Sequence, residues 1–530
     1  MKKPKLNSRQ QEILDSFVRE SRKVRRFLTL TELKELGFTR EMLRQSFDSL
    51  SKLKKLARAA YPTELSELIE ENLFDPKRMV ALQKELRKCK RFVVTAAINN
   101  SAVHKGFHKA LKEYCKYNKA MLIIMPSGTS LDAMSPNLAD DNWIFENTAL
   151  NSNIWLSNIK INPNSAQPTT ALSRIGQRDG SLIVASPKQF LNFVPVGNEK
   201  LPHAVMSTGA ITVPNYSSPK TGRVTRTDYF AEHDHVLGAV IVEVVSGKEY
   251  HFRQIQAAND GSFHDLGKKY FANRKPLAVA PIGMLWGDLH AGEVDKEAKR
   301  AAFEQMTETR VKRVFIGDGF GGISINHHEE KNLITRAILA MKSKMSLEAE
   351  VKDFVNEINE ISEKADEVVI VASNHHDFLN KYIQLGKYIN EPNNYYFASK
   401  LATAMMEGHD PLEFAARNLV GLKYPKRVRF LKRDEDYMLA GVQMGQHGDK
   451  GSNGSKGSKV TLETAYGKIM HGHTHSPYIF RGVYCVGTTS ILRPDFVSGA
   501  SSWVHCNGFV YPDGSCQLVN SFYGNWRAAA

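Results

Sequence analysis

The feature that most constrains the fold of this 530-residue chain is a series of five short Gly, Asp, Asn and His motifs in its C-terminal half. Each of the first three motifs follows an apolar run that is typical of a buried strand. Because helical patterns separate these runs, we expect alternating strands and helices, with the motifs at the carboxyl ends of neighbouring strands. The apolar runs are 277–286, 311–316 and 368–372, and the helical patterns are 296–306, 332–341 and 346–361.

A single motif of this kind, in a chain with 18 histidines, is more often an ordinary polar feature than a set of metal ligands. The order of the five motifs and their placement after strands favour one shared site. They are Gly287-Asp288-Leu289-His290, Gly317-Asp318, Asn374-His375-His376-Asp377, Gly445-Gln446-His447-Gly448 and Gly472-His473-Thr474-His475.

This series resembles the signature of the calcineurin-like metallophosphoesterase superfamily, which runs D-x-H, G-D, G-N-H-D or G-N-H-E, a lone H, and G-H-x-H. The resemblance covers roughly residues 275–525. Within the superfamily, the variable spacings and an added basic module look most like the double-strand-break repair nucleases, including the bacterial SbcCD nuclease subunit. The overall build is also similar to the pre-early DNA-degradation and transfer proteins of large tailed phages. The resemblance implies an α/β fold with a metallophosphoesterase β-sandwich flanked by helices.

The resemblance also implies two bound divalent metal ions. Such a pair, about 3.5 to 4 Å apart, supplies a nucleophile and neutralises charge when a phosphodiester is cleaved. Imidazoles mixed with carboxylate and amide oxygens suit Mn²⁺, Fe²⁺ or Zn²⁺ better than Ca²⁺, and Mn²⁺ best fits a nuclease of this type. His375 would stabilise the transition state or protonate the leaving oxygen. By resemblance one metal is held by Asp288, His290, Asp318 and His475, and the other by Asp318, Asn374, His447 and His473.

The sequence departs from the family pattern at two places, one in the third motif and one just after the second motif. The acid that can orient this histidine in the family is displaced here to Asp377, so its orienting partner is in doubt. Gly321 stands where many phosphatases have a second Asp, so the sequence disfavours a protein phosphatase. Two further features are interpreted as lying outside the metal site. The stretch 326–329 copies the Asn-His pattern but has no preceding strand, and His471 is interpreted as structural.

The N-terminal end is strongly basic. Residues 1–60 hold 16 Lys or Arg against 7 Asp or Glu, which is +9 of the net +15, so we expect a polyanionic partner such as DNA. Apolar spacing predicts three helices, with Thr31 and Thr39 capping the second and third and Gly37 in the turn, as in a helix-turn-helix. A solvated helical face or a protein-docking module is the alternative. The candidate DNA-binding residues are Arg25, Arg26, Arg40, Arg44, Lys52, Lys54 and Lys55, with Lys450 and Lys456 in the glycine-rich loop 445–457.

The chain is divided into a helix-turn-helix-like module at 1–62, a mixed α/β region at 63–275 and a metallophosphoesterase domain at 276–525. In the middle region the apolar pattern predicts a strand-helix-strand unit and, later, a hairpin, with loops between them. No glycine-rich phosphate loop opens the helix, so a nucleotide site there is unsupported. The strand-helix-strand unit comprises 92–98, 102–117 and 120–126, the loops 147–170, and the hairpin 236–245 and 250–255.

Composition excludes several other classes of protein. With 42% apolar and 24% charged residues the chain is neither globally disordered nor fibrous, and its longest apolar runs are too short to cross a bilayer. Its five cysteines form no C-x-x-C pair, which fits a reducing cytoplasm, that of the host for a phage protein.

The function expected from these patterns is that of a metal-dependent DNA nuclease that hydrolyses phosphodiester bonds by a two-metal mechanism, with host DNA as substrate for a phage protein. One alternative is a phosphatase or phosphodiesterase acting on small phosphorylated compounds. Another is a non-enzymatic DNA-binding or DNA-transfer factor on a phosphoesterase fold. The sequence leaves open whether the chain forms a homo-oligomer or binds a protein partner.

Overall fold

The computed structural model describes most of the chain. The residues described are 6–23, 27–28, 30–61, 76–99, 101–128, 135–138, 140–197, 201–216, 225–326, 332–494 and 499–528. None of the helices in these ranges is long and apolar enough to cross a membrane.

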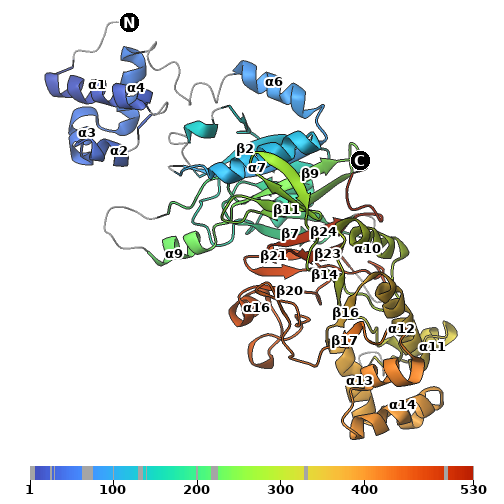
Figure 1. Cartoon of the computed structure of the whole chain (residues 1–530). Helices are drawn as coiled ribbons and strands as arrows, with labels where there is room; N and C mark the ends of the chain where they lie inside the picture. The colour runs from blue at the N-terminus through green and yellow to red at the C-terminus, as the bar shows by residue number, and fades with distance from the viewer. Residues whose placement is uncertain are drawn as a thin grey trace.

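A small helical module forms the N-terminal end of the molecule (Figure 1). Its helices enclose their own apolar core, in which Phe17 stacks on Phe27 with ring centroids 5.5 Å apart. The predicted turn and third helix are confirmed, because Gly37 has a φ of +87° and the Thr39 side chain accepts a hydrogen bond from the Met42 N–H. The helices are α1 (Ser8–Lys23), α2 (Leu30–Glu35), α3 (Arg40–Phe47) and α4 (Leu50–Ala60).

Two details of that prediction are wrong. α2 begins at Leu30, so Thr31 lies inside the helix and not at the capping position before it. The expected third helix is two helices, because Asp48, with a φ of +62°, ends α3 and the Ser49 side chain caps α4 by accepting a hydrogen bond from the Lys52 N–H. A positive φ in a non-glycine residue interrupts a right-handed helix whatever the apolar spacing, and the spacing by itself does not reveal it.

The middle region contains the predicted strand-helix-strand unit. β1 (Arg91–Ile98) and β2 (Met121–Ser127) are parallel and joined by α7 (Lys105–Asn118), which follows α6 (Pro76–Leu86) in the chain. The predicted hairpin is also present, and its strands β9 (Gly238–Val244) and β10 (Tyr250–Gln256) pair antiparallel. With β3 (Asn142–Trp143) these strands form a five-stranded sheet in the order β10-β9-β1-β2-β3.

A six-stranded sheet carries the first three motifs. Its order is β17-β16-β15-β14-β23-β24, with β14 to β17 parallel and the last two strands antiparallel. The apolar run 277–286 is not one strand as expected, because it is divided between two sheets at residues 279–282, where Pro281 offers no N–H to a ladder. The strands are β14 (Gly283–Trp286), β15 (Arg313–Ile316), β16 (Glu367–Ile370), β17 (Val428–Phe430), β23 (His505–Val510) and β24 (Cys516–Ser521).

A ten-stranded sheet joins the middle region to the C-terminal region. Its order is β18-β19-β20-β22-β21-β7-β8-β6-β5-β4, so β21 pairs with β7 across the predicted boundary at residue 275 (Figure 1). Two of its strands fall in 147–170, where only loops were expected, since strands this short give little apolar alternation. The strands are β4 (Thr148–Asn151), β5 (Ile154–Ser157), β6 (Ser181–Val184), β7 (Phe190–Val194), β8 (His203–Ser207), β18 (Met438–Leu439), β19 (Val442–Gln443), β20 (Ile469–His471), β21 (Tyr478–Phe480) and β22 (Val483–Cys485).

The six-stranded sheet lies between two apolar layers. Side chains alternate along its strands, so Leu285 belongs to the core shared with the ten-stranded sheet, while Met284 and Trp286 face the helices. These helices include the predicted ones, and Asn332 and Ser346 cap the second and third of them. The chief helices of this region are α10 (Lys296–Thr309), α11 (Leu333–Met341), α12 (Leu347–Lys364), α13 (Asn374–Gln384) and α14 (Pro392–Met406).

The remaining elements are short. A three-stranded sheet packs beside α7, and further helical turns lie in the connections. These elements are β11 (Phe263–Asp265), β12 (Lys268–Phe271), β13 (Arg274–Ala278), α8 (Ser173–Asp179), α9 (Arg226–His233), α15 (Pro411–Phe414), the π-helical turn Ala415–Val420, and α16 (Lys459–Tyr466).

Candidate metal centre

The first three motifs meet at one edge of the six-stranded sheet. Asp288 lies two residues after β14, Asp318 two residues after β15, and Asn374 is the first residue of α13, which follows β16. These three strands are parallel neighbours, so their carboxyl ends lie at the same edge. The last two motifs follow β19 and β20 of the ten-stranded sheet, so both sheets contribute to the centre.

Two groups of ligand-type side chains meet at this edge. Within each group, one potential ligand atom per residue lies within 4.8 Å of all the others. Asp318 belongs to both groups and is buried. The first group is Asp288, His290, Asp318 and His475, and the second is Asp318, His447 and His473.

In the first group the imidazoles converge on the carboxylates. His475 Nε2 lies 3.3 Å from Asp288 Oδ2 and 3.0 Å from His290 Nε2. His290 Nε2 is 3.8 Å from Asp318 Oδ2. The His473 N–H donates a 2.6 Å hydrogen bond to Asp288 Oδ2, which holds the carboxylate in place.

The second group surrounds the other side of Asp318. His447 Nε2 lies 3.0 Å from Asp318 Oδ2, and the rings of His447 and His473 have centroids 5.2 Å apart. Asn374 Oδ1 is buried and has no hydrogen-bond partner among the described residues, as expected of an oxygen reserved for another ligand. One oxygen each of Asp288 and Asp318 is in the same state.

The electrostatics of the cluster favour a cation. Burial opposes ionisation of Asp318, but the imidazoles of His375 and His447 outweigh it and hold the pKa of this carboxyl well below its usual range. Burial also opposes a charge on His447, yet Asp318 and Asp288 raise its pKa to about 9. Burial lowers the pKa of His290 to about 3 and keeps that imidazole neutral. The ionised Asp318 and the neutral His290 are in the protonation states that metal binding requires, whereas His447 would have to release its proton to bind a metal. The raised pKa of His447 shows that the two carboxylates attract positive charge at this position.

The glycines of the motifs allow the ligands to approach one another. A Cβ on Gly472 would lie 2.1 Å from Asp288 Oδ1, and one on Gly317 would lie 2.9 Å from the same oxygen. A Cβ on Gly287 would lie 2.6 Å from the Thr488 backbone. Any larger residue at Gly472 would therefore displace Asp288.

The backbone of the cluster is strained. Four of the ligand-type residues have positive φ values, between +40° and +74°, a region that non-glycine residues rarely adopt. Such strain persists where the surrounding structure imposes it, and it is concentrated at functional sites. The four residues are His290, Asp318, His473 and His475.

His375 is held beside the ligands by a main-chain carbonyl. Its Nδ1 donates to the Gly321 oxygen, and its Nε2 lies 3.9 Å from Asp318 Oδ2. The partner of His375 Nδ1 is therefore the Gly321 carbonyl, and not the carboxylate that the metallophosphoesterase resemblance implies. Asp377 instead lies 3.6 Å from Arg433 Nη2 and 3.8 Å from Lys450 Nζ.

The interpretation of His471 as a structural residue is confirmed, and the interpretation of the stretch 326–329 is not tested. His471 is buried, its Nε2 lies 2.8 Å from the Tyr478 hydroxyl, and its Nδ1 lies 2.9 Å from the Gly472 oxygen. Both ring nitrogens are thus occupied by structural hydrogen bonds. His327 and His328 lie outside the described residues.

The basic residues proposed for DNA contact divide into several groups. Arg40 and Arg44 are exposed on α3, and Lys55 is exposed on α4. Lys52 is exposed but pairs with Asp48. The expectation for Lys54 is wrong, because it is only 6% exposed and lies over the Phe27 ring. Arg25 and Arg26 lie outside the described residues, and the exposed Lys450 and Lys456 form the backbone bridge that closes the glycine-rich loop.

Two neighbours of the centre were not predicted. The Trp503 ring packs against His475, with centroids 4.2 Å apart. Arg433 donates a 2.9 Å hydrogen bond to the Ala372 oxygen and also pairs with Asp449, two residues after His447. Neither residue belongs to a motif, so no local pattern in the sequence marks them.

A search of curated proteins places this chain beside a phage protein. It is similar to "Protein A1" of Escherichia phage T5, with 26% identity over 490 residues that cover 84% of each chain. No protein-family model matches the chain, and no solved structure matches it significantly.

Proposed function

We propose that this protein is a metal-dependent DNA nuclease that hydrolyses phosphodiester bonds with two divalent metal ions. The observation that carries the proposal is that Asp318 belongs to both ligand groups of the centre. A carboxylate shared in this way is the arrangement that brings two cations close enough to act on one phosphate. The first group has the same four residues as one ligand set implied by the metallophosphoesterase resemblance, and the second has three of the four residues of the other, Asn374 being the fourth.

The donor chemistry selects the class of metal. Four imidazoles and two carboxylates, joined by the Asn374 amide, suit borderline transition ions such as Mn²⁺, Fe²⁺ or Zn²⁺. Mg²⁺ and Ca²⁺ prefer shells made of oxygen alone. When bound, the two ions would supply a nucleophile at neutral pH and neutralise charge on the phosphate. We propose Mn²⁺ as the working metal.

His375 is the proposed proton donor. Because a carbonyl oxygen only accepts, the hydrogen bond to Gly321 requires a proton on Nδ1 of His375. The ring orientation is thereby fixed, and Nε2 is left beside Asp318 to hold or release a proton. In this position Nε2 can protonate the leaving oxygen of a cleaved phosphodiester.

The layered architecture and the relative support two further parts of the proposal. A sheet with helices on one face and a second sheet on the other agrees with a metallophosphoesterase sandwich of the repair-nuclease type. The similarity to a phage T5 protein supports a phage origin, and we propose host DNA in the host cytoplasm as the target.

Two other functions are less well supported. A phosphatase for small compounds needs neither the exposed cations of α3 and α4 nor the lysines of the loop beside His447. A non-enzymatic DNA-binding or transfer factor would have to retain two buried carboxylates among buried imidazoles without a cation to compensate them, which is costly.

The experiment that tests the proposal is an incubation of the purified full chain with supercoiled plasmid, linear duplex, single strands and a chromogenic phosphodiester. Each substrate is combined with Mn²⁺, Mg²⁺ or chelator, and the Asp318→Ala protein serves as the control for contaminating nucleases. The proposal expects Mn²⁺-dependent cleavage of DNA that Asp318→Ala lacks. Turnover of the small diester alone would favour the phosphatase, and no cleavage with any metal would favour the non-enzymatic factor.

A further inference from the structure

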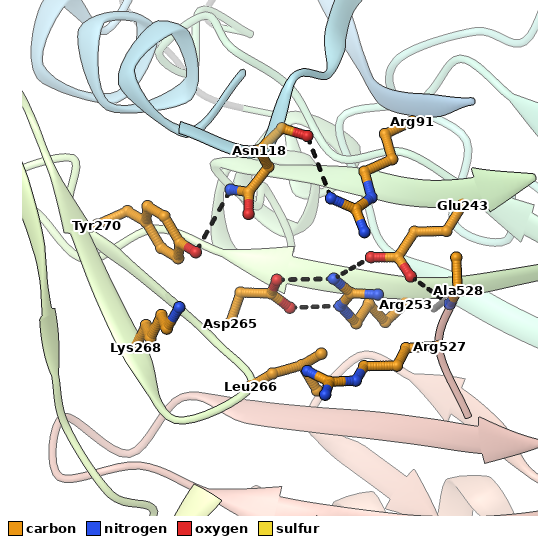
Figure 2. A pocket seen from close by; sticks show the side chains of 10 residues that line it. All are labelled: Arg91, Asn118, Glu243, Arg253, Asp265, Leu266, Lys268, Tyr270, Arg527 and Ala528. Carbon is orange, nitrogen blue, oxygen red and sulfur yellow. Dashed lines mark hydrogen bonds and ion pairs between the residues drawn. The ribbon is translucent and has the colours of Figure 1, made fainter. Parts of the chain in front are cut away.

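A second polar site lies apart from the metal centre, and none of its lining residues belongs to the two ligand groups. It is a cavity of about 180 Å³ enclosed by β1, β9, β10, β12, the end of α7 and the C-terminal segment (Figure 2). The lining residues are Arg91, Asn118, Glu243, Arg253, Asp265, Leu266, Lys268, Tyr270, Arg527 and Ala528.

The floor of this cavity is a buried ion network centred on Arg253. Its guanidinium Nη2 lies 2.8 Å from Asp265 Oδ2 and 3.0 Å from Glu243 Oε1, and its side chain is only 3% exposed. Nη1 of the same guanidinium is buried and has no hydrogen-bond partner in the part of the chain that the structure describes. An unsatisfied buried donor is costly unless another acceptor reaches it.

The lining carries an excess of positive charge. Four basic and two acidic side chains line the cavity, for a net charge of +2. Arg527 is paired with Glu308, whereas neither Arg91 nor Lys268 forms an ion pair with any described residue. Figure 2 shows Arg91 and Arg253 approaching Glu243 from opposite sides, with Lys268 on the far side of Asp265. The Arg253 network itself holds two carboxylates against one guanidinium, a net charge of −1. Arg91 and Lys268, which form no ion pair with a described residue, therefore outweigh that charge and leave the lining positive.

We infer that this cavity binds a phosphate group, either the free ion or the end of a small phosphomonoester. Several oxygens on one anion suit several converging donors, and Arg offers a planar fork for them. The volume is equivalent to about six water molecules at about 30 Å³ each, well below that of sites for drug-sized ligands. The Tyr270 hydroxyl and the Asn118 amide, which lie 3.4 Å apart, are further polar groups in the lining.

The inference is tested by calorimetric titration of the full chain with inorganic phosphate, glycerol phosphate and acetate. Because a metal centre also attracts phosphate, the titrations use protein freed of metal by chelation and dialysis, and are repeated on Asp318→Ala. The pocket variant is Arg91→Ala with Lys268→Ala. The matched control is Lys90→Ala with Lys269→Ala, which removes the neighbouring cations that do not line the cavity.

Metal-free wild type and Asp318→Ala are expected to bind phosphate equally, and acetate more weakly. The pocket variant should lose about tenfold or more in affinity, the equivalent of at least one charge-assisted hydrogen bond, and the control variant should not. Tighter binding of glycerol phosphate than of phosphate would identify a phosphomonoester as the ligand, and the reverse the free ion. Unchanged affinity in the pocket variant, loss in Asp318→Ala, or no binding to wild type would overturn the inference. Circular dichroism verifies the fold of each variant. Because the measured quantity is phosphate binding, these outcomes do not depend on nuclease activity.

Discussion

The substitution Gly472→Ala tests whether the close packing of the candidate ligands is required for the metal centre. The added Cβ would lie 2.1 Å from Asp288 Oδ1, whereas ordinary contact begins at 3.4 Å. The Asp288 carboxylate must therefore move by about 1.3 Å, or the backbone must shift by as much. Gly472 does not have a positive φ, so the expected effect comes from this collision and not from backbone strain.

A displacement of about 1 Å at a reacting centre can cost about 100-fold in rate, and overpacking of a buried site costs about 1 to 3 kcal/mol of stability. We therefore expect Gly472→Ala to retain less metal and to cleave DNA about 100-fold more slowly. Elemental analysis of the purified protein measures the metal, and plasmid cleavage measures the rate. Gly247→Ala, at a position with nothing within 4 Å of the added Cβ, is the matched control. Wild-type metal content and rate in Gly472→Ala would refute the reasoning.

The remaining predictions concern the shared ligand, the proton donor, the metal and the basic module. Asp318→Ala should lose both metals and all DNA cleavage while circular dichroism shows a retained fold; retention of one full equivalent of metal would argue against a shared ligand. His375→Ala should keep its metal but cleave DNA about 100- to 10,000-fold more slowly, as expected for removal of a general acid. If the purified variant contained no metal, His375 would instead be a metal ligand. Mn²⁺ should support faster cleavage than Mg²⁺, because imidazoles dominate the donor set; equal rates would contradict this. Charge reversal at Arg40 and Arg44 should weaken DNA binding and leave the turnover of a small diester unchanged. The slope of log affinity against log salt concentration should become less steep by about 0.9 for each phosphate that the protein no longer neutralises. An unaltered slope would show that α3 does not bind DNA.

Several features of this protein were determined by local sequence. The apolar runs before Asp288, Asp318 and Asn374 end where the structure ends its strands, to within a few residues. Because parallel strands bring their carboxyl ends to one edge, the order of the motifs and their placement after strands together indicated a common site. The Thr39 cap and the turn at Gly37 were predictable because both depend on interactions within a few residues of the chain.

Other features depended on contacts between distant parts of the chain. Nothing in the local sequence distinguishes Lys54 from an exposed lysine, but the packing of α4 places it over the Phe27 ring. The orienting group of His375 is the carbonyl of Gly321, 54 residues away, and a backbone oxygen has no signature in the sequence. The pairing of β21 with β7 across residue 275 likewise joins two segments that local patterns assign to separate regions.

The difference has a physical cause. Strand and helix patterns, caps and turns arise from short-range sterics and hydrogen bonds, so the sequence by itself determined which residues could become ligands. Which carboxylate lies between two groups of imidazoles, and which cations remain without an ion pair around a cavity, follow from how sheets pack. Such contacts join residues far apart in the chain. The resemblance implied that Asp318 belongs to both ligand sets, but only the tertiary structure brought those side chains together and placed Arg91 and Lys268 beside the Arg253 network.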